Sequence, residues 1–351
     1  MGFVELASRW RNTVRMIARI AVLGSIVPTT LLAAAYSTGA ISTWWIELLQ
    51  YVPYPTHLVP ALIALALSFE LRWPWRLVAL ISVGLIVTII MGLVLGHADT
   101  GSSPARMMTY NAKLGQAVER PGGVQALEQE IASHHPDILV MQDAGELTEA
   151  RKHRPDLGES IFKDRNVFAQ SQYIVATRFP LRDCRLDDFS YRNRHADYVH
   201  CIITVEGQDI DLYTAHLISP RRGLNAARYE RIDGVDDWQQ NFADRLEQAH
   251  KVAADISMRT RPMILAGDLN ASEASPVIRA LLATGVRDAF SSAGLGYGYT
   301  HGHALRFGFS FLRIDHILVS KEIGVANAYP GGWQASEHRP VIADLLLRRS
   351  D

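Results

Sequence analysis

The first hundred residues of this chain contain very little charge. Residues 1–98 hold six Arg, no Lys, no Asp and three Glu, out of 35 basic and 36 acidic residues in the whole 351-residue sequence. The remaining part, residues 99–351, therefore carries 29 basic and 33 acidic residues. Nucleic-acid-binding proteins usually carry an excess of positive charge, because neutralisation of phosphates supplies much of their affinity. The missing excess argues against a long nucleic-acid footprint, while a local basic groove stays compatible with this balance.

Cysteine is also scarce. Cys184 and Cys201 both lie in the charged part of the chain, and two residues are too few for a disulfide scaffold or a metal-binding set of cysteines. They flank the turn-rich stretch 191–194, so a disulfide across two neighbouring strands is one interpretation. Two ordinary buried thiols are the other interpretation, and the sequence does not decide between them.

Long apolar runs fill the charge-poor part. Three stretches have no formal charge, Ile20–Ile46, Leu48–Phe69 and Leu77–Gly96, and a helix needs about twenty apolar residues to cross the hydrocarbon core of a bilayer. Tryptophans stand near the predicted ends of these runs, as aromatic residues do at membrane interfaces: Trp44, Trp45, Trp73 and Trp75. We therefore predict a membrane anchor of three transmembrane helices over residues 1–98. Buried helices of a soluble domain are the alternative, but three such runs in succession are difficult to bury.

The arginines predict the orientation of this anchor. Four precede the first run and two lie between the second and third, whereas the connection 37–47 contains no Lys or Arg. The positive-inside rule places the N-terminus and the second connection in the cytoplasm. A multi-pass protein with three crossings would then hold its later part on the extracytoplasmic side. Cleavage near Ala33–Ala35 would remove the first run and leave that part outside. Residues 99–104 are small and polar and are expected to be a flexible linker.

From residue 105 onward, short apolar segments alternate with helical patterns. Strands are expected at 106–110, 138–141, 173–177, 199–205, 210–215, 263–266, 314–319 and 341–347. Helices are expected at 123–133, 242–258 and 276–283. This alternation predicts an α/β sandwich over residues 105–351.

Polar residues stand at the ends of most of these strands and can converge on one edge of the sandwich. They are Asn111, Asp143, His216, Asp268, Asn270, Asp315, Glu337 and His338. Carboxylate and amide oxygens select Mg²⁺ or Mn²⁺ rather than Zn²⁺. His338 needs a partner that sets its tautomer, and a carboxylate such as Asp315 is a suitable one.

Each of these positions also has a simpler explanation when it is considered alone. The segment Gly267–Asn270 suits a structural turn, and Asp143 with Glu146 suits a helix capping box. Asp315 could pair with Arg313, and a single histidine such as His216 is more often a hydrogen-bonded core residue. The joint occurrence of these residues at successive strand ends is what favours a catalytic site.

These segments resemble the endonuclease/exonuclease/phosphatase superfamily, which has the deoxyribonuclease-like fold. The resemblance covers about residues 105–349 and rests on six ordered blocks, Met108–Asn111, Pro136–Asp143, Tyr213–Leu217, Gly267–Asn270, Arg313–Leu318 and Ser336–Val341, supported by Arg245, Gln248 and Thr300. It implies a four-layer α/β sandwich, in which two mixed β-sheets are flanked by helices. It also implies hydrolysis of a phosphodiester or phosphomonoester with Mg²⁺ or Mn²⁺ as cofactor.

The resemblance implies a role for each residue. Asp143 binds the metal with Asn111 beside it, and Glu337 lies close to the metal. Asp268 activates or orients the attacking water, and Asn270 holds the phosphate. Hydrogen bonds to the phosphoryl oxygens come from His216 and His338, and Asp315 orients His338.

Two positions depart from the family's pattern. Asp143 stands where Glu is usual, and Glu337 stands where Asp is usual. We interpret this as a reciprocal exchange, in which one carboxylate reaches less far and the other reaches further while the charge of the site is kept. Glu146 is a second candidate for the metal ligand, although it lies three residues beyond the strand end.

The substrate is left open by the sequence: a phospholipid head group, nucleic acid or a small phosphoester are all compatible. Arg221 and Arg222 follow His216 closely and are candidate phosphate contacts, although a solvated charged loop explains them equally well. Residues 305–309 form a second candidate specificity loop. A catalytically inactive member of the fold, acting as a membrane-tethered binding module, is the alternative function. The lipid bilayer is the partner expected for the apolar helices, and the sequence indicates no obligate protein partner.

Overall fold

The computed structural model describes residues 2–39, 43–101, 105–119, 122–192, 194–229, 233–305 and 308–347. The chain divides into two compact units, Met1–Leu93 and Val94–Asp351. Three predicted features lie partly outside the described residues: the linker at 102–104, the turn between the cysteines at 193, and the candidate specificity loop at 306–307.

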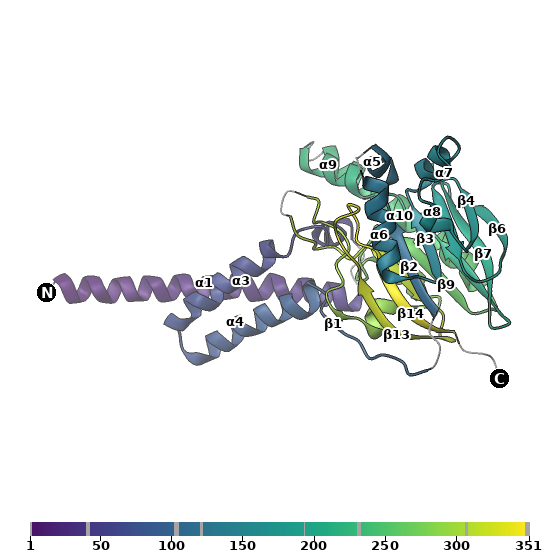
Figure 1. The fold of residues 1–351 in the computed structure, drawn as a ribbon. Helices are drawn as coiled ribbons and strands as arrows, with labels where there is room; N and C mark the ends of the chain where they lie inside the picture. The colour runs from purple at the N-terminus through teal and green to yellow at the C-terminus, as the bar shows by residue number, and fades with distance from the viewer. Residues whose placement is uncertain are drawn as a thin grey trace. The chain divides into compact units, whose positions relative to one another are not determined.

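The first unit is helical (Figure 1). It consists of α1 (Gly2–Thr38), α2 (Trp44–Leu49), α3 (Pro55–Leu67), η1 (Ser68–Glu70), α4 (Trp73–Leu85) and η2 (Ile86–Ile90). Two of its helices, Ser8–Thr38 and Trp73–Ile90, are long and apolar enough to cross a membrane. The apolar helix Pro55–Glu70 is shorter than that. The second predicted run began at Leu48, but the helix begins only at Pro55, because proline lacks an amide proton and is tolerated at the first position of a helix.

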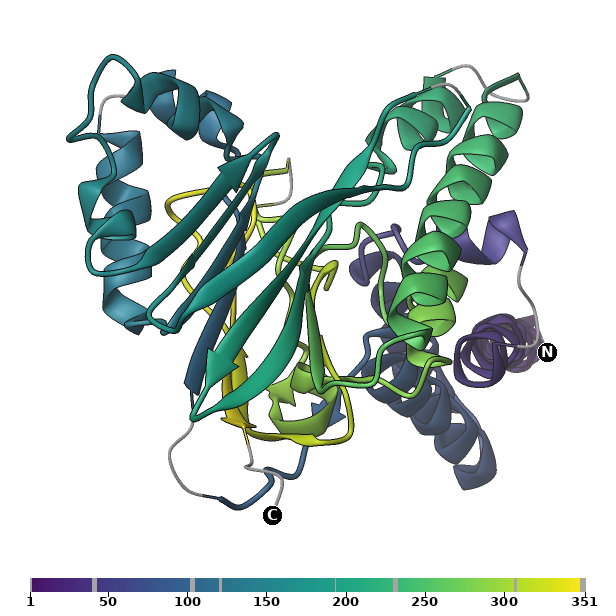
Figure 2. The same ribbon diagram turned by 90° about the vertical axis from the view of Figure 1, so that its right-hand side faces the viewer.

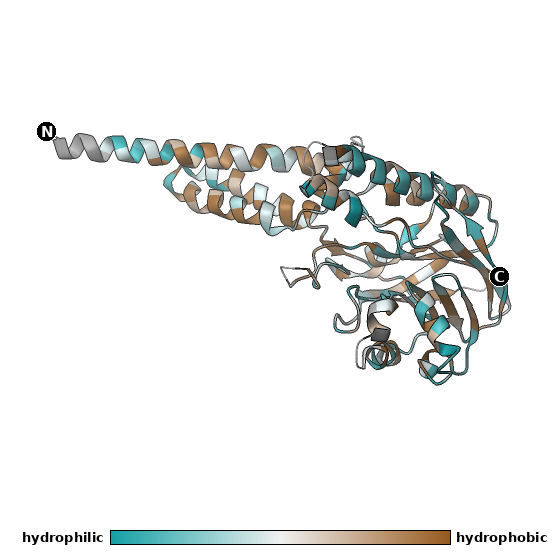
Figure 3. Cartoon of the chain, turned by 90° about the horizontal axis from the view of Figure 1, so that it is seen from above, coloured by the Kyte–Doolittle hydropathy of each residue, from teal (hydrophilic) through white to brown (hydrophobic). Residues whose placement is uncertain are grey.

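Small and hydroxyl-bearing side chains lie inside this helical unit. The hydroxyls of Ser25 and Ser82 are 2.7 Å apart and buried, and Val22, Ala64 and Ala79 form a small buried cluster. Large apolar side chains point outward instead, among them Ile20, Leu31, Ile63 and Leu80. Figure 3 shows many turns of these helices in brown, the hydrophobic end of its scale. This distribution is the reverse of that in a soluble helical bundle.

The third apolar run ends differently from the prediction. We expected one span over Leu77–Gly96, but the helix ends at Ile90, and Val94–Leu95 forms β1, which pairs with β11 (Leu295–Gly296). The amides of Gly96 and His97 donate to carbonyls of the same unit, and the Asp99 carboxylate accepts a 2.9 Å bond from the Val325 amide. Residues 94–99 are therefore hydrogen-bonded within the second unit, although the flexible linker was expected to begin at Asp99.

The second unit contains two six-stranded sheets (Figure 2). In one, the order is β13–β14–β2–β3–β5–β4; in the other it is β10–β12–β9–β8–β7–β6. The first sheet consists of β2 (Ala105–Asn111), β3 (Ile138–Gln142), β4 (Asn166–Gln170), β5 (Tyr173–Thr177), β13 (Ile323–Pro330) and β14 (Val341–Leu347). The second consists of β6 (Leu181–Asp188), β7 (Asp197–Val205), β8 (Gln208–Thr214), β9 (Met263–Asp268), β10 (Arg287–Asp288) and β12 (Asp315–Val319). Among the described strands, only the pairs β2–β3 and β8–β9 are parallel, so both sheets are mixed, as expected.

The two sheets pack face to face around the main core. Met107, Val140 and Val175 of the first sheet share a buried cluster with Val199, Leu212 and Ile264 of the second. Helices α5 (Leu114–Glu119), α6 (Gly123–His134), α7 (Gly145–Arg151) and α8 (Glu159–Phe162) cover the outer face of the first sheet. The second sheet is flanked by α9 (Arg221–Tyr229), α10 (Asp233–Ser257) and α11 (Pro276–Leu282), and α12 (Ala289–Ala293) closes one end of the core. The expected α/β sandwich is confirmed.

Strands β4, β6, β10 and β13 were not predicted, and all four are edge strands. The side chains of β4 are mostly exposed and those of β6 are exposed or partly buried, so these two strands lack the apolar pattern by which a strand is recognised. Strand β6 also settles the question of the cysteines. Cys184 on β6 and Cys201 on β7 form a disulfide between neighbouring strands.

Candidate functional site

The direction of the strands explains why distant segments meet at one edge. Because β2 and β3 are parallel, the last residue of β2, Asn111, and the residue after β3, Asp143, lie at the same edge of the first sheet. The parallel pair β8 and β9 likewise brings His216 and Asp268 together. Strand β12 runs antiparallel to β9, so its first residue, Asp315, stands directly opposite Asp268.

Hydrogen bonds join the two sheets at this edge. Asn111 Nδ2 donates to Asp268 Oδ2 over 2.8 Å, and both residues are buried. One residue before Asp143, Gln142 Nε2 donates to Thr214 Oγ1 over 2.9 Å. The segment before β14 is attached to the same place, because Ser336 Oγ donates to the Asn111 carbonyl over 2.8 Å. These contacts determine the relative positions of the candidate site residues from the two sheets.

Asp268 lies between two histidines. Its Oδ2 is 3.4 Å from His216 Nε2 and 3.7 Å from His338 Nε2. Burial by itself would raise the pKa of Asp268, but the charges of His338 and His216 and the bond from Asn111 outweigh it and leave the pKa lowered. Asp268 is therefore a carboxylate at neutral pH.

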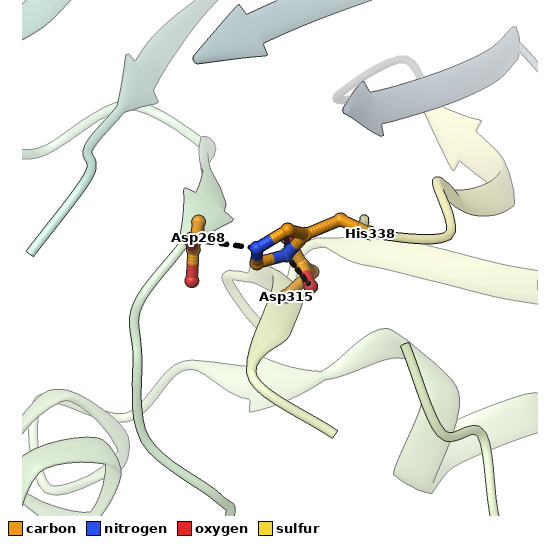
Figure 4. A group of neighbouring side chains, drawn as sticks. All are labelled: Asp268, Asp315 and His338. Carbon is orange, nitrogen blue, oxygen red and sulfur yellow. Dashed lines mark hydrogen bonds and ion pairs between the residues drawn. The ribbon is translucent and has the colours of Figure 1, made fainter. Parts of the chain in front are cut away.

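His338 lies between two carboxylates (Figure 4). Its Nδ1 is 3.0 Å from Asp315 Oδ2, while its Nε2 faces Asp268. Burial would lower the pKa of His338, but the charges of Asp315 and Asp268 outweigh burial and raise the pKa to about 9. The ring is therefore an imidazolium at neutral pH, with a proton on each nitrogen.

Asp268, Asp315 and His338 also offer ligand atoms within 4.8 Å of one another, a spacing that could hold a metal ion. An imidazolium has no lone pair to give to a metal. With one nitrogen directed at each carboxylate, this group fits proton donation better than metal binding.

Three other residues, Asn111, Asp143 and Glu337, were expected to lie at the metal. Asn111, Asp143 and Glu337 offer amide and carboxylate oxygens, the ligands that Mg²⁺ and Mn²⁺ prefer. Asp143 Oδ2 is 2.5 Å from Lys113 Nζ, and Glu337 Oε2 is 3.1 Å from Arg221 Nη2. Both carboxylates thus attract cationic groups.

Both carboxylates are charged at neutral pH. Burial would raise the pKa of Asp143, but the charges of His216 and Lys113 leave it lowered. Burial would likewise raise the pKa of Glu337, but the hydrogen bond from Arg221 and its charge outweigh burial and lower the pKa. Glu146, the second candidate ligand, is exposed on α7, with its carboxylate beside Gly115.

The backbone gives a reason for the shorter acid at position 143. Asp143 has a φ of +49°, in the left-handed region. Among residues other than glycine, Asp and Asn enter this region most readily, and longer side chains such as Glu do so less often.

The residues expected to hold phosphate have other contacts. Asn270 Nδ2 donates to the Leu217 carbonyl over 2.9 Å, and the backbone amide of Asn270 donates to Asp268 Oδ1 over 3.0 Å. These two bonds attach its loop to the ends of β8 and β9. Of the two candidate arginines, Arg221 reaches Glu337, and Arg222 is exposed on α9. The structure therefore brings Arg221, but not Arg222, into contact with a candidate site residue among the described part of the chain.

Several residues of the site were not singled out from the sequence. Lys113 contacts Asp143, and Gln172 Oε1 lies 2.7 Å from His216 Nδ1. The His301 ring is centred 4.6 Å from that of His338; burial and the charge of His338 lower the pKa of His301 to about 4. These residues lie in loops between strands, where neither spacing nor periodicity marks them.

Three residues noted with the family blocks lie next to the site, and two of them hydrogen-bond the backbone that carries it. Thr300 Oγ1 accepts bonds from the amides of Ile314 and Asp315, which positions the first residue of β12. Gln248 Oε1 accepts a 2.8 Å bond from the Ile218 amide, just beyond His216. Arg245 is fully buried on the same helix.

Comparison with known proteins agrees with this geometry. The sequence profile of the Endonuclease/Exonuclease/phosphatase family matches residues 108–338. Comparison with curated protein sequences gives no significant match.

Solved structures share the fold at low sequence identity. TDP2 of D. rerio in complex with a single-strand DNA product is 16% identical, covers 70% of this chain and 100% of its own, and has a TM-score of 0.52. An endonuclease/exonuclease/phosphatase from Bacteroides vulgatus is 14% identical over 70% of this chain and 100% of its own, with a TM-score of 0.52. The mannosyl-6-phosphatase Bt3783 of Bacteroides thetaiotaomicron is 16% identical over 69% of this chain and 99% of its own, with a TM-score of 0.50. At these identities the likeness shows the fold alone.

Proposed function

This chain belongs to the endonuclease/exonuclease/phosphatase family, and we propose that it is a Mg²⁺- or Mn²⁺-dependent phosphoesterase anchored in a membrane. One observation carries the catalytic part of this proposal. Asp268 lies within 3.7 Å of His338 and 3.4 Å of His216 and accepts a bond from Asn111, while Asp315 contacts His338 from the other side. Carboxylate, amide and imidazole groups from both sheets thus meet in one place.

The chemistry follows from these groups. Asp268, as a carboxylate, orients the attacking water and accepts its proton. His338, held by Asp315, donates a hydrogen bond to a phosphoryl oxygen as negative charge develops there, and His216 supports it from the opposite side. Asn111, Asp143 and Glu337 would hold the divalent cation, which would neutralise phosphate charge and polarise the phosphorus–oxygen bond. Asn270 and Arg221 would contact the bound phosphate.

The membrane part of the proposal is supported by the first unit. Its outward-facing side chains are large and apolar, while small and hydroxyl groups lie inside, an arrangement that suits helices in lipid. We propose a multi-pass anchor in which Pro55–Glu70 is a third, shorter crossing between the two long helices.

The extracytoplasmic side is supported by two independent features. The arginines before the first run and between the second and third favour a cytoplasmic N-terminus. The disulfide between Cys184 and Cys201 suits an oxidising compartment, because cytosolic thiols are kept reduced. A C-terminal alkaline phosphatase fusion tests this orientation: it should be active, whereas a fluorescent-protein fusion should be dark. The opposite pattern would place the catalytic unit in the cytoplasm.

Hydrolysis is tested with the full chain purified in detergent. Bis(p-nitrophenyl) phosphate and p-nitrophenyl phosphate serve as general probes, with Mg²⁺, Mn²⁺ or EDTA. We expect metal-dependent turnover that falls by about 10²–10⁴-fold in Asp268→Ala and in His338→Ala, while the partly exposed control Asp209→Ala, paired with Arg182, keeps its activity. Undiminished turnover in EDTA or in Asp268→Ala would contradict the proposal. Absence of turnover on every substrate would favour the membrane-tethered binding module.

The substrate class is identified with a panel on the same preparation. DNA, RNA, sphingomyelin, phosphatidylinositol phosphates and sugar phosphates represent the nucleic-acid, lipid and small-ester alternatives. The ratio of kcat/KM between these groups ranks them.

A further inference from the structure

Lys113 is held against Asp143 by its backbone as well as by its side chain. The amides on either side of it, those of Ala112 and Leu114, donate to the carbonyls of Gln142 and Asp143 over 3.1 and 3.0 Å. The loop after β2 is thus attached to the loop after β3 on both sides of the lysine. Lys113 has a φ of +45° and Asp143 a φ of +49°, so two residues in left-handed conformations face each other. This is a built contact and not a chance approach of a long surface side chain.

Lys113 engages both candidate metal ligands of the first sheet. Its ammonium lies 2.5 Å from Asp143 Oδ2, and its backbone amide donates to Asn111 Oδ1 over 3.2 Å. The other Asp143 oxygen, Oδ1, is 3.5 Å from His216 Nδ1. A divalent cation that takes Asp143 Oδ2 therefore competes with the ammonium for this oxygen, because two cations at one oxygen repel each other.

The charge of Lys113 also reaches the rest of the site. It acts on Asp268 and Glu337 in the direction opposite to burial, favouring their charged forms. The three carboxylates Asp143, Asp268 and Glu337 would repel one another without a nearby cation. Lys113 supplies one that is covalently part of the chain.

From this geometry we propose that Lys113 is an internal cation that competes with the divalent metal for Asp143 and, once displaced, is available to the substrate phosphate. The inference rests on the proposed function, since it takes Asp143 as a metal ligand. Lysine is suited to this exchange because its ammonium is a compact point charge on a flexible stem, and it is a common ligand of phosphate. Lys113 is a positioning residue in this scheme, and it sets how tightly the site binds metal.

The test is direct metal binding by the full chain in detergent, without substrate. Titration calorimetry with Mg²⁺ and with Mn²⁺ is compared for the wild type and Lys113→Met, which keeps the length of the side chain but removes the charge. We expect Lys113→Met to bind Mg²⁺ about tenfold more tightly or better, a difference of about 1.4 kcal/mol. Lys113→Arg should resemble the wild type. Lys152→Met, which removes an exposed lysine paired with Glu149, should leave the affinity unchanged.

Thermal unfolding provides a second readout. Without the lysine the carboxylates repel, so Lys113→Met should melt at a lower temperature in EDTA than the wild type and gain more from added Mg²⁺. With Mg²⁺ saturating, inorganic phosphate should inhibit Lys113→Met more weakly than the wild type, by about tenfold, because the displaced ammonium is missing.

The outcomes separate the two proposals. Equal or weaker Mg²⁺ binding by Lys113→Met, with measurable binding by the wild type, overturns the role of Lys113 and leaves the metal-dependent function intact. Metal binding by Lys113→Met but not by the wild type supports the competition in its strongest form. Absence of Mg²⁺ and Mn²⁺ binding in both proteins overturns the metal-dependent function, and the competition with it.

Discussion

Asp268 and Asp315 stand directly opposite each other on the antiparallel strands β9 and β12, and the ring of His338 lies between their carboxylates. The two aspartates come from segments that are distant in sequence, and His338 comes from a third segment. The pairing of the two strands therefore creates the environment of the histidine. Asp315 contacts Nδ1 of the ring, and Asp268 faces its Nε2 (Figure 4).

Replacement of Asp315 by Asn should lower kcat strongly. The amide keeps the shape of the side chain but loses the charge that orients and stabilises the His338 imidazolium. A loss of about 10²–10⁴-fold is expected, with a smaller change in KM, because the interaction strengthens as charge develops in the transition state. Steady-state kinetics on the generic phosphodiester measure both values. Asp209→Asn, in an exposed ion pair with Arg182, is the matched control. Activity within twofold of the wild type would remove Asp315 from the mechanism.

The exchanged acids at positions 143 and 337 make a reciprocal prediction. Asp143→Glu adds a methylene where Lys113 and His216 already contact the carboxylate, and it places Glu in a left-handed backbone conformation. Activity should fall by about tenfold to 10²-fold, as it does when a site is misplaced by about 1 Å. The double variant with Glu337→Asp should recover most of the loss. A double variant that is no better than Asp143→Glu would show that the two positions are independent.

Asp288 should be a major contributor to stability. It is buried and accepts bonds from Arg313 Nη1 and from the Ser291 amide, both at 2.8 Å, with His316 Nδ1 at 2.7 Å. Asp288→Asn leaves the Arg313 charge without its buried carboxylate partner and with only the more exposed Glu273 beside it, which should cost about 3 kcal/mol. Urea unfolding of the full chain at pH 7 measures this difference. The exposed variant Asp183→Asn should cost less than about 1 kcal/mol.

The same carboxylate predicts a sensitivity to acid. Burial would raise the pKa of Asp288, but the charge of Arg313 and the bond to His316 hold it well below its usual range. A carboxyl group with a lower pKa in the folded than in the unfolded state stabilises the fold fully above its unfolded pKa, and this contribution is lost as the pH falls through the folded one. The free energy of unfolding of the wild type should therefore decrease below about pH 4 more steeply than that of Asp288→Asn. Parallel slopes in the two proteins would contradict this assignment.

The disulfide between Cys184 and Cys201 should stabilise the catalytic unit. The two residues are 17 apart in sequence, so closing this loop should be worth about 3 kcal/mol in the chain-entropy description. The double variant Cys184→Ser with Cys201→Ser should unfold at a correspondingly lower urea concentration, and reductant should lower the midpoint of the wild type alone. In protein taken directly from cells, a maleimide should label the denatured chain only after reduction. Labelling without reduction would show that the bond does not form in its compartment.

Much of the site could be predicted from the sequence because its residues lie at strand ends inside short recognisable blocks. Asp143, Asp268 and His338 each follow or precede an apolar segment whose pattern marks a strand. The apolar runs of the first hundred residues were equally visible, because the absence of charge is a property of composition and needs no tertiary contact. Two mixed sheets and membership of the family were expected on these grounds and are confirmed.

The features that the sequence could not show are those that depend on pairing between distant segments. That Val94–Leu95 leaves an apolar run to pair with Leu295–Gly296 depends on a partner some two hundred residues away, so the composition of the run did not show it. The edge strand β6 lacks an apolar pattern, yet its register brings Cys184 to Cys201.

Composition and local pattern thus marked the candidate site residues and the apolar runs of the first hundred residues, because both are properties of short segments. Only the tertiary structure decided which charge faces which: Lys113 on Asp143, Arg221 on Glu337, and His338 between Asp268 and Asp315. The energy of an electrostatic interaction falls with the distance between the charges and rises with their burial. Both the distance and the burial are fixed only when the strands have paired.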